Sequence, residues 1–147
     1  MTTPCERTFT VNGRTMTARC WHDSHKTPLL ALHGWLDNAA TFDLLAPLLS
    51  DFYIVALDFA GHGWSEHRAA GTRYHILDHV DDVLSIVNQL GWQRFTLMGH
   101  SMGAGVASLL SSALPERVEK LVMIEGLGPY TGKPEDAAKH LRTALLE

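Results

Sequence analysis

The stretch RFTLMGHSMGAGVASLLSSA, residues 94–113, joins an apolar run, a glycine-flanked serine and a run of helical composition. Residues 94–98 predict a strand and the residues after the serine predict a helix, so Ser101 falls in the turn between them. Gly99 and Gly103 stand two residues before and after the serine, where a sharp turn leaves no room for side chains. The pattern is typical of a nucleophile elbow, which exposes a serine hydroxyl at the carboxyl end of a strand.

On both sides of this turn, the chain alternates between predicted strands and predicted helices. Apolar runs predict buried strands at 28–32, 52–57 and 118–125, and helical spacing predicts helices around 42–49, at 74–90, at 102–113 and from Pro134 onward. Before them, Asn12-Gly13 between two β-prone runs predicts a hairpin. A leading hairpin followed by alternating strands and helices indicates an α/β domain with a mainly parallel sheet and flanking helices.

The bulk properties of the chain exclude several function classes. Its 147 residues are the length of one domain, and a net charge of −4 without a basic cluster argues against nucleic acid as a partner. The first residues have no apolar core of the kind expected in a signal peptide, no apolar run reaches membrane-spanning length, and no glycine-rich nucleotide-binding loop follows any strand. We therefore expect no membrane association and a cytoplasmic protein, in which Cys5 and Cys20 are reduced thiols even if the hairpin makes them neighbours.

Three segments are expected to meet at the carboxyl ends of the parallel strands, where open α/β sheets bind ligands. They are LHGW at 32–35, DFAGHGWS at 58–65 and the serine turn at 99–103, and each follows an apolar strand. Asp58 opens a loop that contains two glycines. We interpret its side chain as closing that loop through backbone amides rather than as a catalytic acid.

With LHGWLDN at 32–38 added to the serine turn, the chain resembles the N-terminal half of an α/β-hydrolase. It is most similar to the serine hydrolase-like group, close to the haloalkane dehalogenase and epoxide hydrolase branch. The resemblance runs from the hairpin to the strand at 118–125. It implies a single partial domain, with a core at 1–132 that lacks the last two strands of the family and, at 133–147, the start of a lid helix.

The resemblance also implies roles for individual residues. Ser101 would be the nucleophile, and the backbone amides of Trp35 and Met102 would form the oxyanion hole. His33 and Gly34 would belong to the same motif as Trp35. The residue pattern agrees, because Met102 opens a helix and its amide is free to face developing negative charge.

A serine nucleophile needs a base, which in this family is a histidine held by a carboxylate. Glu125, at the end of the strand after the elbow, is our candidate for the carboxylate, with a plain strand-end side chain as the alternative. The family takes its histidine from a loop after the last strand, and none of the nine histidines matches that position. We therefore expect the 147-residue chain to lack turnover.

Two functions remain in competition. The first is hydrolysis of a small ester or related acyl substrate through an acyl-enzyme, with no metal and no organic cofactor. A serine disfavours dehalogenase and epoxide hydrolase chemistry, which needs a carboxylate nucleophile. The second is a truncated, non-catalytic binding or interaction module. In that case the strand at 118–125, apolar on both faces, would be an open edge able to pair with another copy.

For several other tryptophan, aspartate and histidine side chains, we expect positions at a pocket, in the core or in solvent, without a role in the chemistry. Trp35 and Trp64 would line a substrate mouth or belong to the core. A helix face exposed to solvent is expected for Asp78, Asp81 and Asp82. Solvated positions without metal-ligand spacing are expected for His22, His25, His67, His75 and His79.

Overall fold

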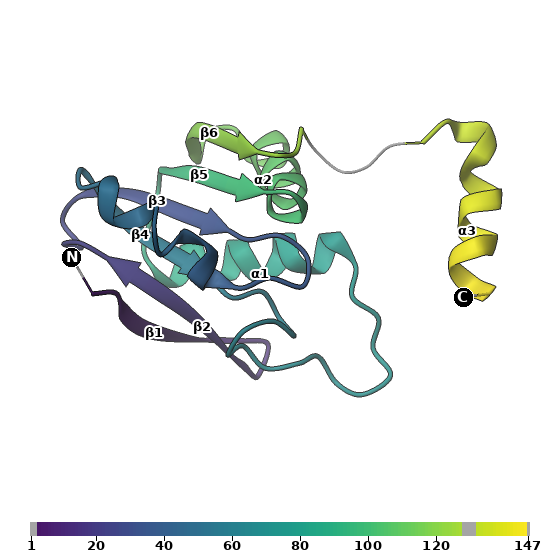
Figure 1. Ribbon diagram of the computed structural model, residues 1–147, viewed down its shortest axis with the longest axis horizontal. Coiled ribbons are helices and arrows are strands. Elements are labelled where there is room, and N and C mark those ends of the chain that lie inside the picture. Colours follow the sequence, from purple (N-terminus) through teal and green to yellow (C-terminus); the bar gives the residue numbers. More distant parts are fainter. Residues whose placement is uncertain (1–2, 128–131, 147) are drawn as a thin grey trace.

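A computed structural model of the chain describes residues 3–127 and 132–146. Within them, one mixed sheet carries strands in the order β1-β2-β4-β3-β5-β6 (Figure 1). Strand β2 runs antiparallel to both of its neighbours, β1 and β4, and β3, β4, β5 and β6 are parallel. Their bounds are β1 Cys5–Val11, β2 Arg14–Trp21, β3 Thr27–Leu32, β4 Phe52–Leu57, β5 Phe95–His100 and β6 Val118–Ile124. The predicted α/β class is confirmed.

The first two strands form the predicted hairpin. Asn12 and Gly13 have φ angles of 49° and 76°, the left-handed values that a two-residue hairpin turn requires. At the far end of the hairpin, Cys5 lies opposite Cys20, and both are free thiols. Burial raises the pKa of the Cys20 thiol to about 11, so this sulfur stays protonated at neutral pH.

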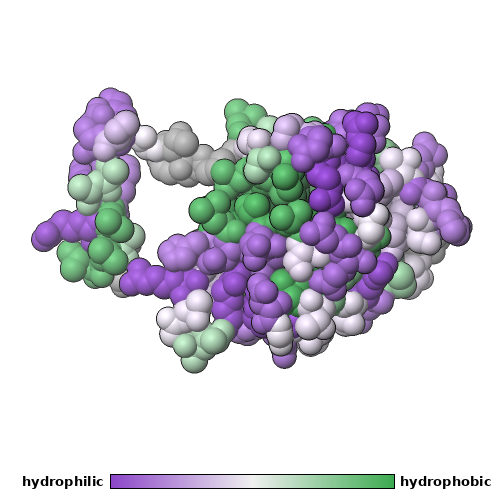
Figure 2. Space-filling model, turned by 180° about the vertical axis from the view of Figure 1, so that it is seen from behind, coloured by the Kyte–Doolittle hydropathy of each residue, from purple (hydrophilic) through white to green (hydrophobic). Residues whose placement is uncertain are grey.

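Helices α1 (Ile76–Gln89) and α2 (Met102–Ala113) cover one face of the sheet (Figure 1). Alternate strand residues, such as Leu30 and Leu32 of β3, pack in one core cluster with the apolar stripes of both helices. On the outer surface of this face, hydrophobic side chains gather in one area surrounded by hydrophilic ones (Figure 2). Because α2 packs on this face together with α1, its N-terminus at Met102 lies on the same side of the sheet.

The opposite face of the sheet departs from the prediction. Two 3₁₀ turns, η1 (Ala39–Phe42) and η2 (Ala46–Leu48), replace the helix expected around 42–49. The Asn38 side chain caps η1 by accepting the Ala40 amide at 2.9 Å. Proline in η2 has no amide to donate and would clash with the carbonyl four residues earlier in an α-helix, which explains the break.

Strand β6 is the outer strand of the described sheet, and its side chains Leu121 and Val122 remain 37% and 42% exposed. Beyond it, the turn η3 (Pro134–Asp136) leads into helix α3 (Ala137–Leu146), as the proline predicts. Helix α3 buries none of its side chains. None of the helices in the described ranges combines the length and the hydropathy needed to span a bilayer.

Candidate active site

Ser101 stands at a sharp turn between β5 and α2. Its φ of 52° and ψ of −114° are outside every region that ordinary residues favour. Its amide donates to the Ile124 carbonyl of the neighbouring strand at 3.0 Å, and its own carbonyl accepts the Ala104 amide at 2.9 Å. Strain of this kind costs about 1–3 kcal/mol and persists where the surrounding structure enforces it, most often at functional sites.

The glycines on either side explain how the turn is possible. A Cβ at Gly99 would collide with the backbone of Gly103, and a Cβ at Gly103 would collide with the carbonyl of Leu32. Helix α2 therefore begins in direct contact with the end of β3. A Cβ at Gly34 would lie 3.4 Å from the Ser101 Cβ, so the segment after β3 runs beside the serine.

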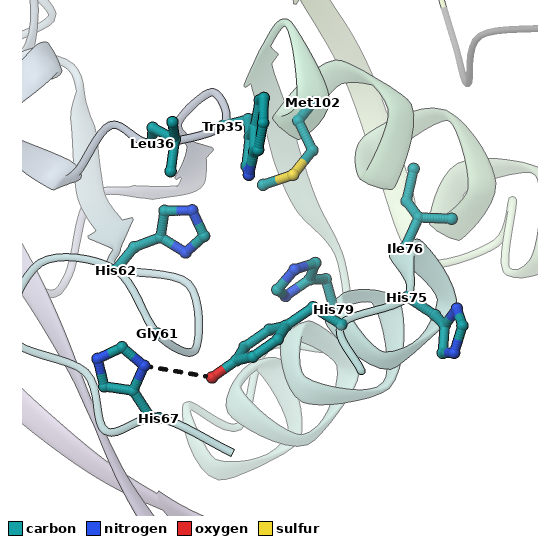
Figure 3. Close-up of a pocket in the computed structure, with 10 residues that line it drawn as sticks. Trp35, Leu36, Gly61, His62, His67, His75, Ile76, His79 and Met102 are labelled. Atoms are coloured by element: carbon teal, nitrogen blue, oxygen red, sulfur yellow. Dashed lines mark hydrogen bonds between the residues drawn. The ribbon is translucent and has the colours of Figure 1, made fainter. Parts of the chain in front are cut away.

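Trp35 and Met102 line the same cavity, of about 310 Å³ (Figure 3). Within the described residues, the amides of Trp35 and Met102 donate to no acceptor. The Met102 amide is also at the N-terminus of α2, which carries the positive end of the helix dipole. Two unengaged amides therefore belong to segments that adjoin Ser101, as an anion-binding site requires.

His33 is fully buried, and both of its ring nitrogens are engaged. Nε2 accepts the Phe59 amide at 3.0 Å, so Nδ1 carries the proton and donates to the Gly34 carbonyl at 2.6 Å. Burial lowers the pKa of this imidazole, which keeps it neutral. His33 thus fixes the segment before Trp35 against the end of β4, and it has no free nitrogen with which to act as a base.

The carboxylate of Asp58 also holds neighbouring segments in place through hydrogen bonds. One oxygen accepts the Ala39 amide at 2.7 Å, and the other accepts the Trp64 amide at 3.0 Å and the Thr17 hydroxyl at 2.9 Å. Gly63 approaches this carboxylate so closely that a Cβ would overlap it. These contacts agree with the interpretation of Asp58 as a loop-closing residue.

Glu125 directly follows β6 and is exposed, with a φ of 52°. The preceding residue, Ile124, bonds the Ser101 amide, and a Cβ at Gly126 would lie 3.1 Å from the Ser101 carbonyl oxygen. The structure therefore places Glu125 at the same sheet edge as Ser101. His100 instead lines a separate cavity of about 140 Å³ beside η1 and Ile124.

Of the five histidines expected at solvated positions, His79 is buried, whereas His25, His67 and His75 are exposed. His79 is only 3% exposed, and its pKa is lowered to about 4 by burial and, to a smaller extent, by the charge of Arg68 and by His62. His67 and His75 line the cavity next to Trp35. In residues 3–127 and 132–146, no group of three His, Cys, Asp or Glu side chains is arranged to hold a metal ion.

The acidic face of α1 is also only partly solvated. Asp82 is fully buried and binds Arg14 at 2.8 Å and Arg68 at 2.6 Å, so its predicted exposure is wrong. Asp78 accepts the His75 amide at the start of the helix, at 3.0 Å, and Asp81 is exposed. A signal was present in the sequence, because position 82 follows His79 by three residues and precedes the buried Ile86 by four.

The two tryptophans belong to the surface rather than to the core. Trp35 is 71% exposed at the rim of the cavity of about 310 Å³. Trp64 is 81% exposed and lines a different cavity, next to Asp58 and Arg19. Of the two alternatives left open by the sequence, the core is therefore excluded for both.

Comparisons with known proteins agree with this geometry. Residues 27–145 match the family model described as alpha/beta hydrolase fold. A serine hydrolase-like protein of Dictyostelium discoideum is 38% identical over 136 residues, which are 90% of this chain and 38% of that protein. The crystal structure of a hypothetical protein from Pseudomonas aeruginosa PAO1 is 50% identical, with a TM-score of 0.90 over 96% of this chain and 50% of that one.

A thioesterase domain from the curacin biosynthetic pathway is also similar, at 28% identity and a TM-score of 0.85, over 97% of this chain and 52% of that domain. The chain thus spans about half or less of the length of these proteins. The family match covers the end of β3, the serine turn and β6, which are the elements that build the site. The chain belongs to the α/β-hydrolase family.

Proposed function

We propose that this chain carries the nucleophile and the oxyanion hole of a serine hydrolase that cleaves small esters or related acyl compounds. One observation carries the proposal: the strained backbone holds Ser101 at the N-terminus of α2, beside the Trp35 and Met102 amides, which have no acceptor in the described part of the chain. The similarity to a thioesterase domain supports acyl chemistry. A serine also suits an acyl-enzyme, whereas alkyl-ester intermediates need a carboxylate nucleophile.

In the proposed reaction, the Ser101 hydroxyl attacks the substrate carbonyl while a base takes its proton. The carbonyl oxygen becomes an oxyanion that the amides of Trp35 and Met102 bind, and each such donor stabilises the transition state by about 3–4 kcal/mol. Departure of the alcohol or thiol leaves an acyl-enzyme, which water then cleaves. Glu125 would orient the base from the end of β6.

We propose that the base is a histidine from the part of the fold that the relatives hold beyond the matched half. The histidines of the first segment and of the serine turn support this, because His33 has both nitrogens engaged and His100 lines a different cavity. The proposal predicts that Ser101 gains its reactivity only when that second half is present.

Active-site labelling tests the proposal on two proteins: the 147-residue chain, and the same chain joined to the unmatched half of the Pseudomonas aeruginosa protein. With a fluorophosphonate probe, we expect labelling of the joined protein at Ser101 and none of the shorter chain. Ser101→Ala in the joined protein is the matched control and should abolish labelling. A folded joined protein that stays unlabelled would contradict the proposed nucleophile. Labelling of the shorter chain would contradict the proposal that the base comes from the second half.

A second candidate, a non-catalytic interaction module, is favoured by the open edge of β6. Leu121 and Val122 are 37% and 42% exposed on this strand, and unpaired apolar edges promote association between chains. For the 147-residue chain alone, we expect light scattering after size exclusion to show a dimer or larger species. Val122→Lys should shift it toward the monomer, because edge lysines oppose strand pairing. A monodisperse monomer of the unmodified chain would rule this candidate out.

A further inference from the structure

Two histidines line the cavity beside Trp35 and carry ring nitrogens that no group in residues 3–127 or 132–146 bonds. His62 lies in the loop between β4 and α1, and His79 belongs to α1 (Figure 3). His62 Nε2 and His79 Nδ1 are both buried atoms, and neither has a hydrogen-bond partner among the residues that the structure describes. Buried polar atoms are almost always paired, so each such exception calls for a ligand or another explanation.

The tautomer of His62 follows from its other nitrogen. Nδ1 lies 3.0 Å from the Ala60 carbonyl oxygen, which can only accept, so Nδ1 carries the proton. In the uncharged ring, Nε2 is then an acceptor with an unused lone pair. His62 also lies next to the buried His33 ring, with ring centroids 5.2 Å apart, which limits its freedom to turn away.

His79 supplies a hydrogen-bond donor that complements the acceptor on His62. It is 3% exposed, and burial with the nearby Arg68 charge lowers its pKa to about 4, so at neutral pH it is an uncharged imidazole with one N–H donor. Its ring centroid is 6.3 Å from that of His62. A single oxygen can bridge such a pair, because each hydrogen bond to it spans about 2.8 Å.

We propose that His62 and His79 bind a hydroxyl group of the substrate in this pocket. A hydroxyl donates to His62 Nε2 and accepts from the His79 N–H, and so satisfies both rings. A carbonyl lacks the donor, an ammonium lacks the acceptor, and a charged group is poorly suited to a site beside the buried ring of His79. The apolar part of the wall includes Trp35, Leu36, Ile76 and Met102, and the polar residues His67, Tyr74 and His75 also line the cavity.

This inference rests on the proposed function and extends it. The same cavity is lined by Trp35 and Met102, whose amides we assign to the oxyanion. The substrate class is then an ester or thioester whose apolar body carries a hydroxyl group away from the reacting carbonyl. A site built to hydrogen-bond a hydroxyl discriminates strongly against analogues that lack it.

Binding of two small probes tests the inference without any turnover. Benzyl alcohol and toluene share the apolar ring and differ in the hydroxyl group. In the 147-residue chain carrying Ser101→Ala, we expect benzyl alcohol to bind about tenfold more tightly than toluene, the worth of one to two neutral hydrogen bonds. His62→Phe should reduce this preference to about one, whereas His67→Phe, at an exposed histidine of the same cavity, should keep it.

Nitrogen-15 NMR of the unmodified side chains provides a second readout, which does not depend on the folding of any variant. Binding of benzyl alcohol should change the nitrogen-15 chemical shifts of His62 Nε2 and of one nitrogen of His79 in the direction expected for a new hydrogen bond. Toluene should produce no such change at either ring. Equal affinity for the two probes, or unchanged imidazole nitrogens, would overturn the inference. Because Ser101 is absent from the binding assay, a failure of the proposed nucleophile would leave this result intact, and the two failures are distinguishable.

Discussion

Asp82→Ala is expected to lower the free energy of unfolding by about 3–5 kcal/mol, the cost of breaking a buried ion pair by removing one partner. Asp82 is fully buried and binds both Arg14 and Arg68, whose side chains are only 14% and 13% exposed. Removal of the carboxylate leaves two guanidinium groups with little access to water and no counter-charge. Urea denaturation should show this loss as a lower midpoint with an unchanged slope.

The neighbouring position offers a matched control. Asp81 is exposed on the same helix, so Asp81→Ala should change stability by less than about 0.5 kcal/mol. Asp82→Asn keeps one oxygen that can accept a hydrogen bond but removes the charge. Its loss of stability should therefore lie between those of Asp81→Ala and Asp82→Ala. If Asp82→Ala proves no more harmful than Asp81→Ala, the ion pairs contribute nothing measurable and the buried arrangement is wrong.

The same ion pairs connect the stability of the fold to the cavity. Arg68 also donates its backbone amide to the Tyr74 hydroxyl at 2.7 Å, and Tyr74 lines the cavity with His67. The segment between β4 and α1 contains no helix or strand. Asp82 therefore holds an irregular wall of the pocket by anchoring it to α1.

Local patterns in the sequence were sufficient to predict most of the elements around the serine. The helix expected at 102–113 is Met102–Ala113, and the Asn12-Gly13 turn has the backbone angles expected of it. Both follow from short-range causes, namely helical composition and the preference of those two residues for positive φ. The helix around 42–49 failed because apolar spacing was given more weight than the proline at position 47.

Contacts between distant segments could not be predicted in the same way. Asp82 is buried by two arginines that lie 68 and 14 residues away in the sequence, and His79 is buried beside Phe59. Without those partners, the charged residues of α1 match an ordinary solvated face. The neighbourhood of Gly34 and Ser101 was more predictable, because parallel strands end at a common edge of the sheet.

Gly103→Ala is expected to reverse the usual effect of replacing glycine in a helix. Helix propensity alone predicts a gain of about 1 kcal/mol, because alanine loses less backbone entropy than glycine. Here the new Cβ would collide with the main-chain carbonyl of Leu32, which cannot rotate away as a side chain would. Overpacking of this kind costs about 1–3 kcal/mol, so we expect a net loss of stability.

The two opposing effects make the sign of the change decisive. Chemical denaturation of Gly103→Ala should be compared with Ser112→Ala, at an exposed position of the same helix, which should be close to neutral or slightly stabilising. A stabilised Gly103→Ala would mean that α2 does not begin in contact with β3. The Met102 amide would then be free to lie elsewhere, and the geometry on which the proposed oxyanion hole rests would be lost.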